Sequence, residues 1–299
     1  MTPEAFLDMV IGILPAFATF YMVALGHSIF EKAGILNLAI DGVFFAATGA
    51  AVVGAVGLGN PVYGSILAAV VAAILGLFMS FVLTYLPISH GAVGLSLQFL
   101  GYGLGIVFGY SVRLAVGAIY SYAYSRDAVY EITLVALAIG VLVHLLVEKT
   151  KLGSAIRACG ENPHAAAALG VNVIATRLIA GALGFALIGL GSSLFVLLWV
   201  RIWDIKTYTL GYGWLAFAVA LAAGRHPLFL IPIALLFGGL VDLQTTIQAR
   251  LKVPADVAKL VPFVGALVLM LAYSITRLRR VFAQPTSLGK PYYKEEKSI

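Results

Sequence analysis

The stretch EKTKLGSAIRACGENPHAAAALGVN, residues 148–172, is the longest polar interruption between two strongly apolar segments. Its composition predicts an ordered element rather than a slack linker. Asn162 can cap a helix with its side-chain oxygen, and Pro163 suits the first helical position, where a missing N–H costs nothing. The run Ala165 to Leu169 then favours helix, and Gly170 can end it in the left-handed conformation. The stretch therefore predicts a short helix between two apolar segments.

This predicted helix has two interpretations. Cations on both sides of it favour a surface element that a partner protein grips; they are Lys149, Lys151, Arg157 and Arg177. The alternative is a well-packed loop without a partner. The single cysteine of the chain, Cys159, lies in the same stretch and excludes an internal disulfide.

The composition of the whole chain places it in a membrane. Of its 299 residues, 62% are hydrophobic and 11% are charged, and the mean hydropathy is +1.02. A soluble domain of this size needs far more charge to cover its surface, so we expect an all-α, polytopic helical membrane protein. The net charge of +6 does not indicate nucleic-acid binding, because Lys and Arg in the loops of a membrane protein set its orientation.

The apolar runs predict about 8–10 transmembrane segments, each long enough for a hydrocarbon core of about 30 Å. A short segment at about 208–223 carries two glycines and is followed by Arg225-His226-Pro227, which favours a broken or re-entrant helix. We expect residues 1–280 to form a single transmembrane domain and residues 281–299 a polar, frayed cytoplasmic tail. The other apolar runs lie at about 10–29, 38–56, 64–86, 93–112, 131–149, 177–200, 227–247 and 259–277.

The distribution of Lys and Arg predicts which loops face the cytosol. If the 149–177 loop and the C-terminal tail are cytosolic, twelve of the 19 Lys and Arg residues lie on that side and seven on the other. We therefore expect an external N-terminus and a cytosolic C-terminus. The first residues carry Glu4 and Asp8 but no Lys or Arg, so we expect the first span to be retained rather than cleaved as a signal peptide.

The sequence holds no constellation that predicts an enzyme. It lacks G-x-x-x-x-G-K-[ST], H-E-x-x-H and G-x-S-x-G. Its histidines are scattered, and none pairs with a cysteine or carboxylate at metal-ligand spacing; they are His27, His90, His144, His164 and His226. We expect no catalysis, no bound metal and no cofactor on this chain.

Polar side chains within the apolar segments are candidates for a translocation path, because such groups are costly at membrane depth and face the bundle interior or a wet pathway. For Asp242 and Gln98 a path is favoured over simple helix–helix hydrogen bonding. For Asn37 and Asp41, close to a helix start, bracing of the adjoining loop is preferred. Three aromatic residues beside the broken segment, Tyr208, Tyr212 and Trp214, suit an interfacial belt, with stacking on a sugar or base as the second interpretation. The candidate set is Asn37, Asp41, Gln98, Tyr212, Trp214, Asp242 and Gln244.

Three motifs together resemble a known family of membrane proteins. GILNLAIDG at 34–42 resembles the NLGIEG signature of permease subunits of ABC importers in the ribose, nucleoside and branched-chain amino-acid group. RACGENPHAAAALG at 157–170 resembles the cytoplasmic coupling segment of that family, RAVGENPxAAxxxG. TLGYGWLAFAVALAAGRHP at 209–227 is similar to its GxGFIALAxxxxGxxxP stretch. The motifs cover about 31–272 in the order of the family.

The resemblance implies an importer permease without catalysis of its own. Two permease subunits, the second a distinct paralogue, would form the path in a prokaryotic-type cell membrane. Separate cytosolic ATPase subunits, which bind ATP and Mg, would each receive one coupling helix in a surface groove. An extracytoplasmic solute-binding protein would deliver a small polar solute, and the remaining partners would be membrane lipids rather than nucleic acid.

The resemblance also assigns residues. Residues 150–176 become the coupling segment, and the forms NLAIDG and GENPHAAAALGVN favour the nucleoside and simple-sugar branch. The chain departs from the family at Asp41, where Glu is commoner, and at Cys159, where Val is commoner. The residues implied to couple to the ATPase are Arg157, Gly160, Glu161, Asn162, Pro163, Ala165, Ala166 and Gly170.

Two alternatives stay open. One is an ABC permease for branched-chain amino acids. The other is an ion-coupled secondary transporter that uses Asp41 and Asp242 as proton sites. The absence of a clear internal repeat, and a polar loop that would have no evident role in such a transporter, both disfavour the second alternative.

Overall fold

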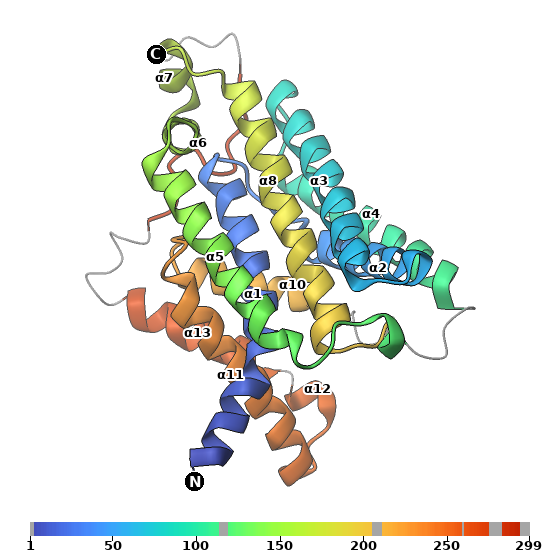
Figure 1. The fold of residues 1–299 in the computed structure, drawn as a ribbon. Helices are drawn as coiled ribbons and strands as arrows, with labels where there is room; N and C mark the ends of the chain where they lie inside the picture. The colour runs from blue at the N-terminus through green and yellow to red at the C-terminus, as the bar shows by residue number, and fades with distance from the viewer. Residues whose placement is uncertain (1–2, 114–118, 205–210, 259, 275–282, 294–299) are drawn as a thin grey trace.

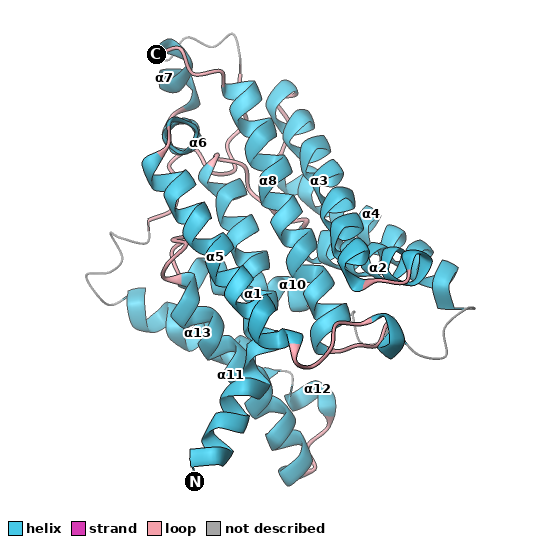
Figure 2. Ribbon diagram, viewed as in Figure 1, coloured by secondary structure: helices cyan, strands magenta, loops and turns pink. Residues whose placement is uncertain are grey.

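The computed structural model describes residues 3–113, 119–204, 211–258, 260–274 and 283–293. Helices make up the fold, and no strand occurs in these ranges (Figure 2). The elements are α1 (Pro3–Lys32), α2 (Ile40–Leu58), α3 (Pro61–Tyr85), α4 (His90–Arg113), η1 (Ile119–Tyr122), α5 (Ala128–Lys149), α6 (Lys151–Glu161), α7 (Pro163–Ala168), α8 (Val173–Leu194), the π-helical turn η2 (Phe195–Trp199), α10 (Tyr212–Ala222), α11 (Leu230–Leu251), α12 (Ala255–Ala258) and α13 (Leu260–Ser274).

The predicted spans coincide with helices. Within the described residues, seven helices are long and apolar enough to cross a membrane, and two shorter apolar helices cover Tyr212–Ala222 and Leu260–Leu269. These nine segments correspond to the nine apolar runs of the sequence. The prediction of an all-α, polytopic membrane protein is confirmed.

Helices α1 and α8 form the centre of the bundle (Figure 1). Two glycines bring their backbones into contact, since a Cβ at Gly26 would lie 2.1 Å from the Gly184 carbonyl oxygen. Helices α2 and α4 cross in the same way, because a Cβ at Gly101 would lie 2.4 Å from the Gly42 carbonyl oxygen. Lipid tails are as apolar as core side chains, so close backbone packing of this kind holds membrane helices together.

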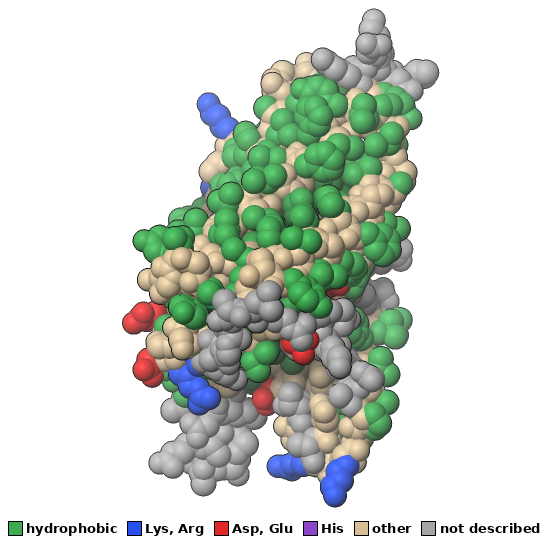
Figure 3. Space-filling view, turned by 90° about the vertical axis from the view of Figure 1, so that its right-hand side faces the viewer, with side chains coloured by type: hydrophobic (Ala, Val, Ile, Leu, Met, Phe, Trp, Pro, Cys, Tyr) green, Lys and Arg blue, Asp and Glu red, His purple; other side chains and the backbone are tan. Residues whose placement is uncertain are grey.

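The outer faces of α3, α4 and α5 are apolar and exposed. Phe78, Phe99 and Leu142 are 53%, 69% and 64% exposed. Figure 3 shows a broad hydrophobic surface on the side of α3 and α4. A contiguous apolar face of this extent is rare on a soluble protein and marks a membrane or subunit contact.

Two interruptions of the helical backbone lie side by side within the bundle. Residues 33–39 join α1 to α2 without forming a helix, and Gly34 turns the chain there at a φ of +84°. Helix α10 has only 11 residues and follows Gly211, whose φ is +74°. Its length of about 16 Å is too short for a hydrocarbon core of about 30 Å. The predicted broken segment is thus confirmed from residue 211 onward, and residues 208–210 lie outside the described ranges.

Helices α6 and α7 and the C-terminal residues lie at one end of the bundle, and the N-terminus lies at the other (Figure 1). The predicted placement of the 149–177 loop and the tail on the same side is therefore confirmed. The prediction of a frayed tail is wrong for residues 283–293, because these residues bond to α6. The rest of the predicted tail, 281–282 and 294–299, lies outside the described ranges.

Candidate translocation path and coupling surface

Asp41 joins three helices at one point. It lies in the first turn of α2 and is 4% exposed. Its Oδ1 accepts a hydrogen bond from the Gly213 N–H at 2.8 Å, and its Oδ2 accepts one from the Tyr102 hydroxyl at 2.6 Å. Gly213 belongs to the first turn of α10, whose free N–H groups favour a carboxylate. Asp41 does brace a neighbour, as preferred from the sequence, but the braced element is α10 rather than the adjoining loop.

Tyr102 extends this network along α4. Its hydroxyl accepts a hydrogen bond from Gln98 Nε2 at 3.1 Å, and the Trp214 indole interacts with the same hydroxyl. Gln98 and Tyr102 are four residues apart and therefore share a helix face. Gln98 Oε1 is buried and has no hydrogen-bond partner among the described residues. The network, which we call the Asp41 network, thus ends in an acceptor that a solute or a water can use.

Aromatic rings enclose the start of α10. The Tyr212 ring lies 4.7 Å from the Phe195 ring and 5.8 Å from the Trp199 ring. Trp214 packs edge-on against Phe217 at 5.7 Å. Tyr212 and Trp214 are thus half-buried against aromatic rings of the bundle, and Tyr208 lies outside the described residues. Aromatic walls beside a few polar groups are typical of a small-molecule site.

Helix α11 carries the two other predicted path residues away from the Asp41 network. Gln244 is buried at 7% exposure, whereas Asp242 is exposed. Helix α11 packs mainly against α1 and α13, while α2 and α4 lie on the other side of the bundle (Figure 1). The structure therefore brings together the path candidates on α2, α4 and α10 but not those on α11.

A second buried carboxylate, Glu31, lies near the end of α1. Its Oε2 accepts a hydrogen bond from Arg225 Nε at 2.5 Å and lies 3.3 Å from His27 Nε2. Glu31 and His27 are fully buried, and Arg225 is 5% exposed. Asn37 also belongs to this group, since its N–H lies 3.5 Å from Glu31 Oε1. Arg225 follows the end of α10, so Glu31 ties that end to the α1–α2 connection.

The 148–172 stretch forms two helices, α6 and α7, of which only α7 was predicted. Asn162 Oδ1 accepts a hydrogen bond from the Ala165 N–H at 3.0 Å, and Pro163 is the first helical residue. Gly170 has a φ of +87° after the helix ends. The predicted caps of α7 are therefore confirmed.

The exposed face of α7 differs from the set that the resemblance implied. Ala166 is 2% exposed and packs against Cys159, Val173 and Tyr292 of the same chain. Ala166 therefore packs on the inner face of α7, and its side chain offers little exposed surface to a partner protein. Leu169, which the resemblance did not assign, is 85% exposed. The exposed residues around α7 are Glu161, Asn162, Ala165, Ala167, Ala168, Leu169 and Gly170.

Residues 283–293, here called the C-terminal strap, hold the end of α6. The Ser287 N–H and hydroxyl both donate to the Gly160 carbonyl oxygen, at 2.9 Å and 2.6 Å. This carbonyl lies in the last turn of α6 and has no partner within that helix. The Thr286 hydroxyl donates to Glu161 Oε2 at 2.7 Å. Gly160 and Glu161, assigned to the ATPase by resemblance, are thus engaged within the chain.

Arg177, at the start of α8, is fully buried where α1 and the strap meet. Its Nε donates to the Ala33 carbonyl oxygen at 3.2 Å, and its Cζ lies 5.4 Å from the centre of the Tyr292 ring. A cation is favoured at the C-terminal end of α1 by the helix dipole. Burial raises the pKa of the neighbouring Cys159 thiol above its ordinary value.

Glu148 links the coupling helices to the spans. It pairs with Arg157 of α6 and lies 3.9 Å from Lys32 Nζ of α1. Arg157 also donates to the Val147 carbonyl oxygen at 2.7 Å. Gly160 lets α6 reach α1, since a Cβ there would lie 2.1 Å from the Lys32 carbonyl oxygen. Arg157, another residue assigned to the ATPase, therefore fastens α6 to α5.

Sequence analysis missed Tyr102, Glu31 and Arg225, and it gave Arg177 only a flanking role. A signal for Tyr102 was present, because it follows Gln98 at helical spacing on the same predicted span. Glu31 and Arg225 are 194 residues apart, and no local pattern pairs them.

Comparison with known proteins gives a family and two relatives. The profile of the family described as branched-chain amino acid transport system / permease component matches residues 9–272. The chain is 30% identical over 251 residues to a putative glucose ABC transporter permease protein, TsgC13, of Haloferax volcanii, covering 76% of this chain and 74% of that protein. It is 27% identical over 142 residues to the nucleoside ABC transporter permease protein NupC of Lactococcus lactis, covering 45% of this chain and 43% of that protein.

The fold is also similar to a solved structure. A chain of PsaBC from Streptococcus pneumoniae, in complex with Fab, matches with a TM-score of 0.55 at 15% sequence identity. The match covers 93% of this chain and 98% of that chain. At this identity the similarity concerns the fold alone.

Proposed function

This chain belongs to the family of permease components of branched-chain amino acid transport systems, and we propose that it lines the translocation path of an ATP-driven importer and receives force through α7. The observation that carries the proposal is the pairing of two features in one chain. The Asp41 network lies inside the bundle. At one end of the bundle, the capped helix α7 exposes the apolar side chain of Leu169. Relatives named as ABC transporter permeases support transport rather than catalysis.

Contacts within the chain form a route from α7 to the path. Helix α7 rests through Ala166 on residues of α6, α8 and the strap. Arg177 of α8 donates to the Ala33 carbonyl oxygen, directly after α1, and residues 33–39 continue from there to α2. Glu31 and Asp41, on either side of these residues, hold the two ends of α10. A displacement of α7 would therefore move α10 relative to α4.

We propose a nucleoside or a simple sugar as the solute. The names of the two relatives support this class. The Asp41 network offers a carboxylate, a phenol, an amide and an indole, which suit hydroxyl groups and ring faces. An amino acid would need a cation for its carboxylate, and these four groups include none. This difference disfavours a branched-chain amino acid as the solute.

We propose that the remaining parts of the importer are separate chains. An ATPase subunit would bind ATP and Mg and hold α7 in a groove, with Leu169 as the projecting apolar side chain. A second permease, a distinct paralogue, would complete the path, and an extracytoplasmic solute-binding protein would deliver the solute. The assembly would lie in a prokaryotic cell membrane.

The test is reconstitution in liposomes with the ATPase and the solute-binding protein. Labelled nucleoside or glucose should accumulate only with ATP, and labelled leucine should not. Leu169→Glu should weaken ATPase binding at least about tenfold, since it places a charge in an apolar contact. Leu251→Glu, at the last residue of α11 and 69% exposed, is the matched control and should bind the ATPase normally. Uptake without ATP, or normal ATPase binding by Leu169→Glu, would contradict the proposal.

A further inference from the structure

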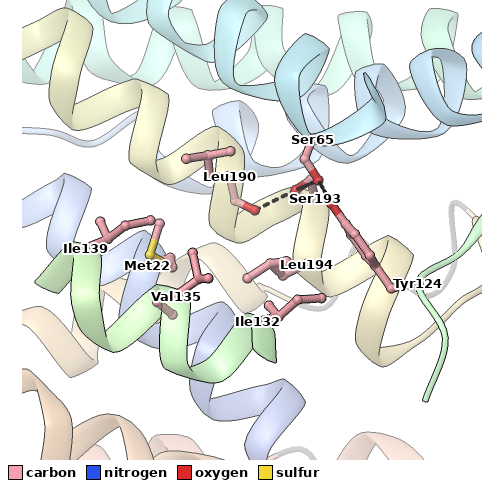
Figure 4. Close-up of a pocket in the computed structure, with 10 residues that line it drawn as sticks. Met22, Ser65, Tyr124, Ile132, Val135, Ile139, Leu190, Ser193 and Leu194 are labelled. Carbon is pink, nitrogen blue, oxygen red and sulfur yellow. Dashed lines mark hydrogen bonds between the residues drawn. The ribbon is translucent and has the colours of Figure 1, made fainter. Parts of the chain in front are cut away.

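We propose that a pocket between α1, α3, α5 and α8 holds one acyl chain of an anionic phospholipid, with the head group at the end of the bundle opposite α7. We call it the lateral pocket. Its volume is about 160 Å³, and its apolar lining includes Met22, Ile132, Val135, Ile139, Leu190 and Leu194 (Figure 4). Sites for whole small molecules measure about 300–1,000 Å³, so this pocket suits a segment of a molecule.

The lateral pocket opens toward lipid rather than toward the Asp41 network. Val135 lines it and is 57% exposed on α5. The neighbouring Leu134 is 67% exposed and the next turns of α5 are apolar as well. Acyl chains match such an apolar face in the hydrocarbon core, and a narrow pocket open on that face admits a single chain.

The pocket extends from one end of the bundle toward its middle. Ser193 lies one residue before the end of α8, and Ser65 lies near the start of α3. Met22 stands ten residues before the end of α1, which is about 15 Å along that helix and half of a hydrocarbon core of about 30 Å. The pocket thus covers the depth that one leaflet's acyl chain covers.

Three hydroxyl groups stand at the outer end of the pocket (Figure 4). Ser65 Oγ lies 2.9 Å from the Tyr124 hydroxyl and 2.8 Å from Ser193 Oγ, and Ser193 Oγ lies 2.7 Å from the Leu190 carbonyl oxygen. Ser193 has a single proton. When Ser193 donates this proton to Ser65 Oγ, the Ser65 hydroxyl donates in turn to the Tyr124 oxygen. The Tyr124 hydroxyl proton can then be donated to an acceptor on a bound molecule. The ester carbonyl of a phospholipid is an acceptor at this depth.

Cations stand beyond these hydroxyls. Arg201 Nη2 donates to the Tyr124 carbonyl oxygen at 2.6 Å, and Arg201 Nε donates to the Leu198 carbonyl oxygen at 3.2 Å. Arg126, two residues after Tyr124, is exposed. Asp127 and Glu131 are also exposed at this end of α5, so the groups here that suit a lipid phosphate are the guanidinium groups of Arg126 and Arg201. Apolar lining, hydroxyl donors and cations therefore follow one another in the order of acyl chain, ester and phosphate.

The test uses the full chain in nanodiscs that contain phosphatidylglycerol with a photoreactive diazirine in its acyl chain. Cross-links located by mass spectrometry should include Ile132 and Ile139 inside the pocket. Val135→Trp should fill the opening and lower these cross-links about tenfold, while Leu134→Trp on the adjacent lipid-facing position should not. Equal labelling of Ile132 and Ile139 in both variants would overturn the proposal.

A wild-type measurement keeps the proposal testable should Val135→Trp fail to fold. Phosphatidylglycerol should label Ile132 more strongly than the same probe built on phosphatidylcholine, because only the former carries net negative charge. At Leu142, which is 64% exposed outside the pocket, the two probes should label equally. Equal labelling by the two probes at Ile132 would overturn the assignment of an anionic lipid, and labelling at Leu142 without labelling at Ile132 would overturn the pocket.

Discussion

Glu31 and Asp41 are ten residues apart and hold opposite ends of the same half-helix. Glu31 bonds to Arg225, which follows the C-terminal end of α10, and Asp41 accepts the N–H of Gly213 at its N-terminal end. The two carboxylates differ in their partners. Glu31 meets a full positive charge in a fully buried site, whereas Asp41 meets a neutral amide and a neutral hydroxyl.

This difference in partners predicts that one end of α10 stays fixed while the other end can move. Removing one member of a buried ion pair leaves the other charge unpaired, so the Glu31 end is a fixed joint. Neutral hydrogen bonds can be exchanged for bonds to a hydroxylated solute at little net cost, so the Asp41 end can release and re-form. The fixed joint lies toward the coupling helices, where Arg225 shares a small polar pocket with Arg157 and Glu161.

The comparison predicts its largest effect at the fixed joint. Glu31→Gln removes the carboxylate and leaves the Arg225 guanidinium buried without a counter-charge, which should lower the free energy of unfolding by about 3–5 kcal/mol. Thermal unfolding in detergent measures this loss. Glu131→Gln, at an exposed position in the first turn of α5, is the control and should change stability by less than about 0.5 kcal/mol.

A double variant separates the buried charge from other causes. Glu31→Gln with Arg225→Gln removes both charges and should regain part of the lost stability, because no uncompensated ion remains. If Glu31→Gln were as stable as the Glu131→Gln control, the fixed joint would not exist and the two ends of α10 would be equivalent.

A smaller loss of stability is expected at the Asp41 end of α10. Asp41→Asn keeps one oxygen for the Gly213 N–H but weakens the bond from Tyr102, and hydrogen bonds to charged groups contribute about 1.5–3 kcal/mol. We expect a folded protein that binds the ATPase normally but takes up solute at least about tenfold more slowly, in line with a loss of about 1.4 kcal/mol. Reconstituted uptake and ATPase binding, measured on the same preparation, test this. Normal uptake would remove Asp41 from the path.

The same comparison shows which features a sequence can supply. The caps of α7 were predictable because Asn162, Pro163 and Gly170 lie within nine residues and act on adjacent backbone. Helix α6 was missed because Gly153 and Gly160 lower helix propensity, although both are needed for close contact. The spans followed from hydropathy alone.

The network around α10 could not be predicted in the same way. Asp41 and Gly213 are 172 residues apart, and their contact depends on how α2 and α10 pack. The strap was predicted to be a frayed tail because its composition is polar. In the structure its Ser287 hydroxyl bonds to the Gly160 carbonyl oxygen of α6. Carbonyls in the last turn of a helix have no partner within the helix whatever its sequence, so no sequence pattern marks this contact. Ala166 was assigned to a partner by resemblance, and only the packing shows that it faces inward.

The smallest effect concerns the strap, which should be the weakest part of the fixed end. Ser287→Ala removes one hydroxyl bond to the Gly160 carbonyl oxygen, and such a bond contributes about 1 kcal/mol. Cys159, the single cysteine, is buried beside the strap and serves as a native reporter. Its labelling by N-ethylmaleimide should accelerate about fivefold in Ser287→Ala, because 1.4 kcal/mol corresponds to a factor of ten.

The pH dependence of this labelling distinguishes release of the strap from general unfolding. Only the thiolate reacts, and burial raises the pKa of Cys159, so labelling of the wild type should stay slow up to a pH above the ordinary thiol pKa of about 8.5. Release of the strap hydrates the thiol and returns its pKa toward that value, which shifts the labelling profile of Ser287→Ala to lower pH. Gln284→Ala, an exposed change in the same strap, should match the wild type. If both variants labelled like the wild type, the strap would be no part of the fixed end, and α6 and α8 would be held to α1 by the Glu148 and Arg177 contacts instead.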